Sequence, residues 1–357
     1  MIMDAFPSEP YSDLSDDEVF ARIAAARAAL GDDALVLGHH YQTEAVVRFA
    51  DLKGDSYELS KKAAESHARL IVFCGVHFMA EAADILTRPE QTVVMPDLEA
   101  GCPMADMASR GELESAWVQL AELGNPDDLF LPVTYINSRA EVKAFCGLHG
   151  GLICTSANAG KALTWALQRR PKVFFLPDQH LGRNTALAQG IPPAEITLWD
   201  PVLPLGGNSL AVLRQARILL WKGHCHVHTR FSTAQVRQAR QAHPEAKVVV
   251  HPECPQEVVA ASDAAGSTGF IVRYVEAAPP GSTIVIGTEI NLITRLARQY
   301  RDRTILPLVS SMCPNMYKNS PRDLLHVLEN PGRVNVVRVA DEIREPARLA
   351  LQRMLDL

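Results

Sequence analysis

The feature that most constrains the fold of this chain is a unit that recurs along it: a short apolar run, a polar turn and then an amphipathic helical pattern. Alternation of this kind is typical of parallel sheets whose faces are covered by helices. The apolar runs lie at residues 34–38, 70–74, 92–95, 129–133, 151–154, 172–176, 225–228, 247–251 and 282–286. They gather in three blocks about 100 residues apart, a common domain size, so the sequence predicts three small α/β units.

The boundaries of these units are expected where turn residues gather. Residues 201–207 are rich in Pro and Gly and follow a Pro-Pro turn at 191–193, which favours a joint before the third block. We therefore expect a first unit over residues 1–112, a second over 113–205 and a third over 206–305, with residues 306–357 packing back on the first unit.

Charge and composition limit the classes of partner. The 357 residues carry 35 Lys+Arg against 41 Asp+Glu, a formal net charge of −6, which gives no basic surface for nucleic acid or an anionic membrane. No apolar stretch approaches the roughly 20 residues that span a bilayer, and the N-terminal segment lacks a basic flank followed by an apolar run. We therefore expect a cytoplasmic protein that binds neither nucleic acid nor membrane.

Polar residues closely follow five of the apolar runs. These segments are 39–42, 135–138, 155–158, 178–180 and 251–254. Ligands of open parallel sheets sit beyond the carboxyl ends of the strands, so five polar strand ends predict a shared cleft. His251 and Glu253 alternate there as an acid/base pair, and Tyr41 and Tyr135 are placed to donate hydrogen bonds or take a proton. A solvated carboxylate and tyrosines that only satisfy core contacts are the alternative interpretation.

The seven cysteines contain no CxxC spacing, so no zinc ribbon or ferredoxin-type cluster is encoded by neighbouring residues. Cys74, Cys146 and Cys154 lie in apolar or helical surroundings and are interpreted as structural. Cys102, Cys225 and Cys313 lie in loops or at strand ends beside Gly, Pro or His, and Cys254 competes with them. Three converging cysteines could hold a [4Fe–4S] cluster with one iron free of protein thiolate, the open position that a Lewis-acid catalyst needs.

Two further patterns could mark a zinc site and anion-binding sites, but each also has a simpler structural interpretation. His224, His226 and His228 would share one face of a strand and could hold zinc, although exposed or hydrogen-bonded histidines are the simpler reading. Residues 155–160 and 265–269 could present N–H groups and hydroxyls to an anion, although N-capping explains either alone. Because the Walker and GxGxxG patterns are absent, a small phosphorylated metabolite fits better than a nucleotide.

Ordered motifs over nearly the whole chain resemble those of quinolinate synthase, a bacterial enzyme family of de novo NAD biosynthesis. They are LGHHYQ (37–42), GDS (54–56), FMAE (78–81), AGCPMAD (100–106), YINS (135–138), CTSAN (154–158), PDQHLGR (177–183), HPEC (251–254), GSTG (266–269) and MCPNM (312–316). The resemblance implies three similar three-layer α/β/α units in a pseudo-threefold arrangement around a central iron–sulfur site. It also implies condensation of iminoaspartate with dihydroxyacetone phosphate to quinolinate, phosphate and water, with the cluster as Lewis acid for dehydration.

The resemblance also implies roles for individual residues. Cys102, Cys225 and Cys313 would each bind the [4Fe–4S] cluster, leaving one open iron and making Cys254 a neighbour. The implied substrate-binding residues are His39, Ser56, Tyr135, Asn137, Ser156, His251, Glu253 and Thr268. Glu253 is implied as the proton shuttle, with Tyr41, Tyr135 and His251 as further catalytic residues.

The implied partners are the two small-molecule substrates and, transiently, the aspartate oxidase that produces iminoaspartate. Two rival hypotheses stay open at this point: another [4Fe–4S] hydro-lyase, and a non-catalytic iron or redox sensor.

Overall fold

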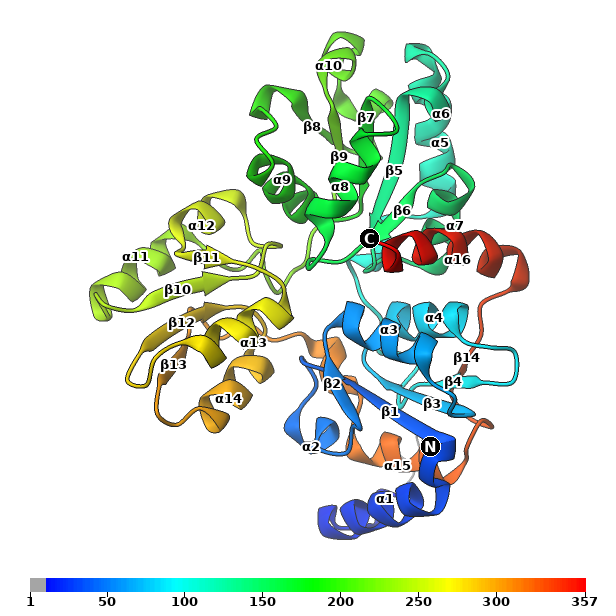
Figure 1. The fold of residues 1–357 in the computed structure, drawn as a ribbon, viewed down its shortest axis with the longest axis vertical. Helices are drawn as coiled ribbons and strands as arrows, with labels where there is room; N and C mark the ends of the chain where they lie inside the picture. The colour runs from blue at the N-terminus through cyan, green and yellow to red at the C-terminus, as the bar shows by residue number, and fades with distance from the viewer. Residues whose placement is uncertain (1–10) are drawn as a thin grey trace, which may run out of the picture.

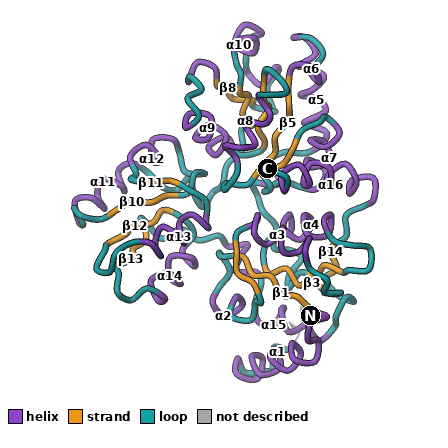
Figure 2. The backbone as a smooth tube through the Cα atoms, viewed as in Figure 1, coloured by secondary structure: helices purple, strands orange, loops and turns teal. Residues whose placement is uncertain are grey.

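In the computed structural model, which describes residues 11–357, three sheets lie in three lobes around a common centre (Figure 1). Every strand pair in the described chain is parallel except one. Helices cover the sheets, and loops gather where the three lobes meet (Figure 2). The predicted α/β class with three units is therefore confirmed.

The first sheet has the strand order β14-β4-β3-β1-β2. Its strands are β1 (Ala34–His39), β2 (Leu52–Gly54), β3 (Leu70–Cys74), β4 (Thr92–Val94) and β14 (Val336–Val337), the last antiparallel to β4. Its helices are α1 (Asp16–Leu30), α2 (Glu44–Val47), α3 (Ser56–Glu65), α4 (His77–Leu86) and α15 (Pro321–Glu329). Alternate residues of β3 enter two apolar clusters, one shared with α3 and α4 and the other with α1 and α15, so helices cover both faces.

The second sheet has the order β6-β5-β7-β9-β8. Its strands are β5 (Phe130–Tyr135), β6 (Leu152–Cys154), β7 (Lys172–Leu176), β8 (Ile196–Trp199) and β9 (Ile218–Trp221). Its helices are α5 (Arg110–Leu120), α6 (Pro126–Leu129), α7 (Ala140–Leu148), α8 (Ala159–Leu167), α9 (Gln179–Ala188) and α10 (Leu210–Gln215). The strand residues are almost all buried, as expected where helices cover both faces of a parallel sheet.

The third sheet has the order β11-β10-β12-β13. Its strands are β10 (Lys247–Val250), β11 (Ala264–Ala265), β12 (Thr283–Gly287) and β13 (Thr304–Pro307), and its helices are α11 (Thr233–Ala242), α12 (Gln256–Ala261), α13 (Thr268–Ala277) and α14 (Ile290–Gln299). Short 3-10 turns elsewhere are η1 (Gly31–Asp33), η2 (Ala105–Met107), η3 (Ala121–Leu123), η4 (Pro193–Glu195), η5 (Pro204–Gly207) and η6 (Pro314–Lys318). No helix of the described chain combines the length and the apolar character needed to cross a membrane.

One expected strand is wrong. Residues 225–228 form a turn, because the backbone N–H groups of His228 and Thr229 both donate to the Cys225 carbonyl, at 3.1 and 3.0 Å. The apolar strand of this region is β9, seven residues earlier, and it pairs with β7 and β8 of the second sheet. The second sheet therefore extends beyond residue 205, and we propose that the second unit ends near Gly223 instead.

The C-terminal segment is divided between two units. Strand β14 joins the first sheet and α15 packs on α1, as expected for a segment that returns to the first unit. The final helix, α16 (Asp341–Leu355), instead packs mainly on α7 and β6 of the second unit, with a smaller contact to α4. A Cβ atom at Gly147 of α7 would lie 1.8 Å from the Pro346 carbonyl oxygen, so glycine permits this close helix contact.

Replacement of Gly147 by Ala tests the contact between α7 and α16. The added methyl group would force the helices apart, and such overpacking typically costs about 1–3 kcal/mol in the free energy of unfolding. Gly111 in α5 is the matched control, since a Cβ atom there meets nothing within 4 Å and a helical Gly→Ala change is worth up to about 1 kcal/mol of stabilisation. Denaturant unfolding compares both variants with the parent, and an unfolding midpoint for Gly147→Ala equal to that of Gly111→Ala would contradict the packing.

Candidate active site

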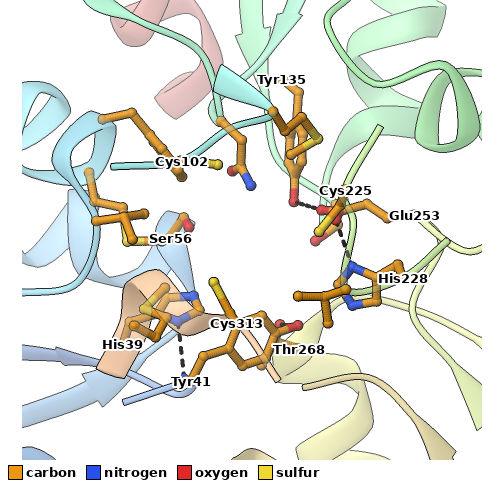
Figure 3. Close-up of a pocket in the computed structure, with 18 of the residues that line it drawn as sticks. His39, Tyr41, Ser56, Cys102, Tyr135, Cys225, His228, Glu253, Thr268 and Cys313 are labelled. Carbon is orange, nitrogen blue, oxygen red and sulfur yellow. Dashed lines mark hydrogen bonds and ion pairs between the residues drawn. The ribbon is translucent and has the colours of Figure 1, made fainter. Parts of the chain in front are cut away.

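A central pocket brings together every residue that the family resemblance implies for the site (Figure 3), whereas the segment 178–180, which its strand-end position also predicted for the cleft, does not line it. Those lining it are His39, Tyr41, Ser56, Cys102, Tyr135, Asn137, Ser156, Cys225, His251, Glu253, Thr268 and Cys313. His39 ends β1 and Tyr135 ends β5, Ser56 and Thr268 begin helices, and the others lie in the loops that follow strands. The site therefore occupies the carboxyl ends of strands from all three sheets, where loop residues converge.

The three candidate cluster ligands come from three separate segments. Cys102 follows β4, Cys225 follows β9 and Cys313 follows β13, and all three line the pocket while only partly buried. The four other cysteines of the chain, Cys74, Cys146, Cys154 and Cys254, are buried and do not line it. Three thiols facing one pocket fit the donor set of a [4Fe–4S] cluster with one iron open to substrate.

Cys254, the competing ligand, points into the core of the third unit. Its Sγ lies 3.9 Å from the Gly287 carbonyl oxygen, and the residue belongs to the apolar cluster beneath β10. Cys254 therefore behaves as a small buried apolar residue beside Glu253.

The three alternating histidines do not form a common metal site. They lie in the turn after β9, so they lack the shared strand face that the zinc hypothesis required. Of the three, only His228 belongs to the one group of metal-ligating side chains found in the described chain, Cys225, His228 and Glu253, whose donor atoms lie within 4.8 Å of one another. His228 and Glu253 already bond each other, so this group differs in chemistry from the three-histidine site.

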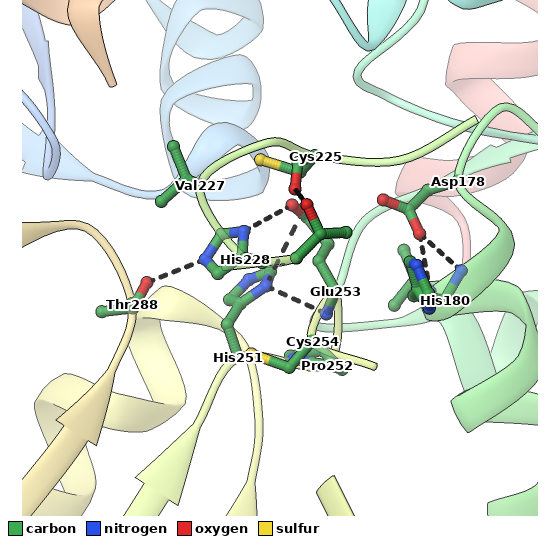
Figure 4. Close-up of polar contacts among 12 residues, drawn as sticks. Asp178, His180, Cys225, Val227, His228, His251, Pro252, Glu253, Cys254 and Thr288 are labelled. Carbon is green, nitrogen blue, oxygen red and sulfur yellow. Dashed lines mark hydrogen bonds and ion pairs between the residues drawn. The ribbon is translucent and has the colours of Figure 1, made fainter. Parts of the chain in front are cut away.

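Glu253 is the centre of the polar network. The residue is 2% exposed, a degree of burial that an ionised carboxylate tolerates only with strong partners. The Tyr135 hydroxyl donates to Oε1 at 2.6 Å, and His228 Nδ1 lies 2.8 Å from Oε2. His251 Nδ1 is 3.8 Å from Oε1, and its ring stacks on that of His228 with the centroids 4.5 Å apart (Figure 4).

A second chain of contacts joins this network to the first unit. His228 Nε2 lies 3.1 Å from the Thr288 hydroxyl, which is 2.7 Å from the Tyr41 hydroxyl. Thr268 in turn donates to the Tyr41 oxygen at 3.2 Å. Figure 4 shows the link from Glu253 through His228 to Thr288. Tyr41 is thus connected to Glu253 through two intermediate side chains, although the two residues come from different sheets.

The charge state of the pocket follows from these contacts. Burial alone would raise the pKa of Glu253, but His228 and His251 and the hydrogen bonds from His228 and Tyr135 bring it below its ordinary value. Burial lowers the pKa of His251 to about 3, so this ring is neutral. We therefore attribute the stabilised charge of Glu253 chiefly to the hydrogen-bonded His228 and Tyr135. Burial, and then the charge of Glu253, raise the pKa values of Tyr135 and Tyr41 well above the ordinary value, so both remain protonated donors.

Two residues of the network were not identified as site residues from the sequence. In the sequence, His228 stands out only as one of three alternating histidines, and no motif singles out Thr288. Thr288 follows β12 directly, so the rule that polar residues at strand ends line the cleft could have found it. His228 carries no such signal, because its place depends on how the turn after β9 folds.

Polar groups in the pocket remain available to a ligand. Asn137 Oδ1 and His226 Nε2 are buried without a hydrogen-bond partner in the described chain, and both residues line the pocket. Thr268 and Ser56 are the first residues of α13 and α3, and Ser156 precedes α8. Helix N-termini favour anions, so these hydroxyls suit a phosphate or a carboxylate. Apolar walls from Val76, Phe78, Met79, Met104, Val227 and Met316 enclose the same space.

Comparison with known proteins identifies the family. The sequence matches the family described as "Quinolinate synthetase A protein" over residues 21–356. It is 51% identical to the quinolinate synthase of Acidobacterium capsulatum, over 99% of this chain and 97% of the relative. It is 50% identical to that of Corynebacterium glutamicum, over 98% and 90%, and 44% identical to that of Bacillus cereus, over 98% and 95%. The match spans all three sheets and the central pocket, and the chain belongs to the quinolinate synthase family.

Proposed function

We propose that this enzyme condenses iminoaspartate with dihydroxyacetone phosphate to give quinolinate, phosphate and water. The observation that carries the proposal is the convergence, in one pocket, of three thiols and a buried carboxylate with two protonated tyrosines. Thiols suit an iron–sulfur cluster, and a carboxylate paired with hydroxyl donors suits proton transfer. The sequence relationship to quinolinate synthases supports the same reaction.

We further propose that Cys102, Cys225 and Cys313 hold a [4Fe–4S] cluster. The three side chains face the same pocket, and the remaining cysteines are buried away from it. When bound, a cluster with three protein thiolates supplies an open iron that acts as a Lewis acid toward a substrate oxygen lost as water. The apolar walls of the pocket lower the local dielectric constant, which strengthens the electrostatic interactions inside it.

The residues of the chain bind and orient the two anionic substrates. In this proposal, His39, Asn137 and Ser56 contact the dicarboxylate of iminoaspartate, and the hydroxyls of Ser156 and Thr268 contact the phosphate at helix N-termini. Asn137 lines the pocket, and its unpartnered Oδ1 can accept a hydrogen bond from the imine N–H, while its amide N–H groups can donate to a carboxylate. Holding both reactants in one geometry removes most of the entropic barrier to a bimolecular condensation.

Glu253 moves the protons. Since its carboxylate is ionised in the free pocket, it acts first as a base, accepting a proton from substrate carbon or nitrogen. Tyr135 donates to Oε1 and His228 bonds Oε2, so the carboxylate is fixed in orientation while one lone pair of each oxygen stays free. The protonated Glu253, or the Tyr41 hydroxyl from its own place in the pocket wall, then returns a proton to a leaving oxygen. His251 completes the wall against which the substrate rests.

The supply of iminoaspartate suggests a protein partner. Imines hydrolyse in water, so we propose transient contact with the aspartate oxidase that forms this substrate. The reaction is expected to require no nucleic acid and no membrane surface.

Metal analysis of cysteine variants tests the cluster. Protein purified without oxygen should contain about four iron and four sulfide per chain, and Cys102→Ala, Cys225→Ala and Cys313→Ala should each lose most of the iron and all quinolinate formation. Cys254→Ala is the control and should keep its iron, because Cys254 does not line the pocket. Zinc in place of iron, or equal iron loss in the Cys254 variant, would contradict the assignment. The enzyme can also be assayed with a panel of other hydroxy acids. If it dehydrates one of them and does not form quinolinate, it is a different hydro-lyase.

Glu253→Gln tests the proton-transfer role. Glutamine keeps the size of the side chain but cannot accept a proton, so kcat should fall by roughly 10²–10⁴, the usual contribution of a general base. Substrate binding should change much less, since other groups contact the substrates. Steady-state quinolinate formation measures both values on protein of equal iron content. A kcat close to that of the parent would remove Glu253 from this role.

A further inference from the structure

The loop that carries Glu253 has few backbone contacts of its own. It follows β10, and within it the Cys254 N–H donates to the His251 carbonyl at 3.0 Å, while the Glu253 N–H donates to His251 Nδ1 at 3.3 Å. Pro252 has no N–H group to donate. The carbonyl groups of Pro252 and Cys254, on either side of Glu253, therefore need partners from elsewhere in the chain.

Asn184 supplies both partners. Its Nδ2 donates to the Pro252 carbonyl at 2.8 Å and to the Cys254 carbonyl at 2.8 Å. Both amide hydrogens are thereby used on the carbonyl groups of the two residues that stand on either side of Glu253. The side chain is 8% exposed, so water does not readily replace these bonds. Asn184 belongs to α9 of the second unit, whereas the loop belongs to the third (Figure 1).

The helix that carries Asn184 is held firmly on its own sheet. Asp178 caps its N-terminus, accepting from the His180 and Leu181 N–H groups at 2.7 and 2.8 Å (Figure 4). A Cβ atom at Gly182 would lie 2.6 Å from both Phe175 and Leu220, so the helix is in close contact with β7 and β9. The helix also packs against α12, which begins just after the loop. Because α9 is held in place, the hydrogen bonds from Asn184 can fix the position of the loop.

The chemistry of the contact requires a carboxamide. An aspartate of the same shape would bring a negative oxygen against two carbonyl oxygens, and an alanine would leave both carbonyls buried without a donor. A general base must lie within hydrogen-bond reach of the proton it takes, and small displacements there are costly.

We propose that Asn184 is a positioning residue for the reaction: by bonding the two carbonyl groups that flank Glu253, it fixes the carboxylate of the third unit relative to the second unit, from which Tyr135 donates to it. This inference rests on the proton-transfer role proposed for Glu253.

Kinetics of Asn184→Ala and Asn184→Asp test the proposal, with Asn208→Ala as the matched control. Asn208 also donates its amide to backbone carbonyls, those of Leu198, Leu205 and Gly206, but it does not line the pocket. We expect kcat for quinolinate formation to fall roughly tenfold to a hundredfold in Asn184→Ala, and further in Asn184→Asp, with KM changing much less. Asn208→Ala should lose stability but keep its kcat. Iron content, measured for each protein, should not differ.

A double-mutant cycle separates positioning from a general loss of structure. If Asn184 acts through Glu253, adding Asn184→Ala to Glu253→Gln should lower kcat by less than about twofold. A full additional loss in that background, or an unchanged kcat in Asn184→Ala alone, would overturn the proposal. Should Glu253→Gln itself keep the parental kcat, the role of Glu253 fails, and the positioning role fails with it.

Hydrogen exchange gives a readout that does not depend on turnover. The backbone N–H groups of His251, Glu253 and Cys254 should exchange faster in Asn184→Ala than in the parent or in Asn208→Ala, because the loop loses its anchor. Equal exchange in all three proteins would show that Asn184 does not hold the loop, whatever its effect on kcat. A parent protein that carries the cluster but makes no quinolinate would refute the proposed function, while faster loop exchange in Asn184→Ala would still show the contact itself.

Discussion

The buried charge of Glu253 is the constraint on which the arrangement of the site depends. The carboxylate of a residue that is 2% exposed must be compensated by donors, and the third unit alone does not supply them. Tyr135 comes from the second sheet, and His228 comes from the segment between the second and third sheets. The network continues through Thr288 to Tyr41 of the first unit. The second and third units must therefore meet in one relative position for the charge to be tolerated, and the first unit is joined to them through Tyr41.

This requirement explains why contacts between units are specific as well as apolar. The final helix, α16, crosses from the first sheet to the second, and a glycine in α7 makes room for its backbone. Asn184 bonds the loop of Glu253 across the boundary between the second and third units. Hydrophobic contact alone would allow the units to slide, whereas hydrogen bonds with defined donors and acceptors fix their orientation.

The sequence predicted most of what is local and less of what depends on distant contacts. Periodic apolar runs such as 70–74 identified central strands, because a buried parallel strand leaves a clear apolar signal. The strand predicted at 225–228 is wrong, because alternating polar and apolar residues are typical of a strand but here form a turn. The sequence indicates a return of the C-terminal segment to the first unit, whereas α16 packs mainly on α7, which lies nearly 200 residues away in the chain and leaves no local signal.

In the candidate site too, the sequence predicted what depends on local position and missed what depends on distant contacts. Residues at strand ends, including Tyr135 and Glu253, could be selected from position alone, and the family resemblance separated Cys254 from the three pocket cysteines. Whether Glu253 is charged could not be predicted, since burial and hydrogen bonding shift its pKa in opposite directions. The outcome depends on His228, whose place is set by a turn that the sequence pattern did not indicate. Asn184 lies inside a helix and gave no signal, because its partners are backbone carbonyls of another unit.

The low pKa of Glu253 in the free pocket has a consequence for the order of events. A carboxylate whose pKa is held below its ordinary value by its donors is a weaker base than a free glutamate. Both proposed substrates carry negative charge, and a like charge placed nearby raises the pKa of a carboxylate. Either anion in the pocket would therefore raise the pKa of Glu253, and the two together would raise it more, so Glu253 becomes a stronger base as the reactants bind. Tyr135 and Tyr41, kept protonated by the same buried charge, remain able to donate at that moment.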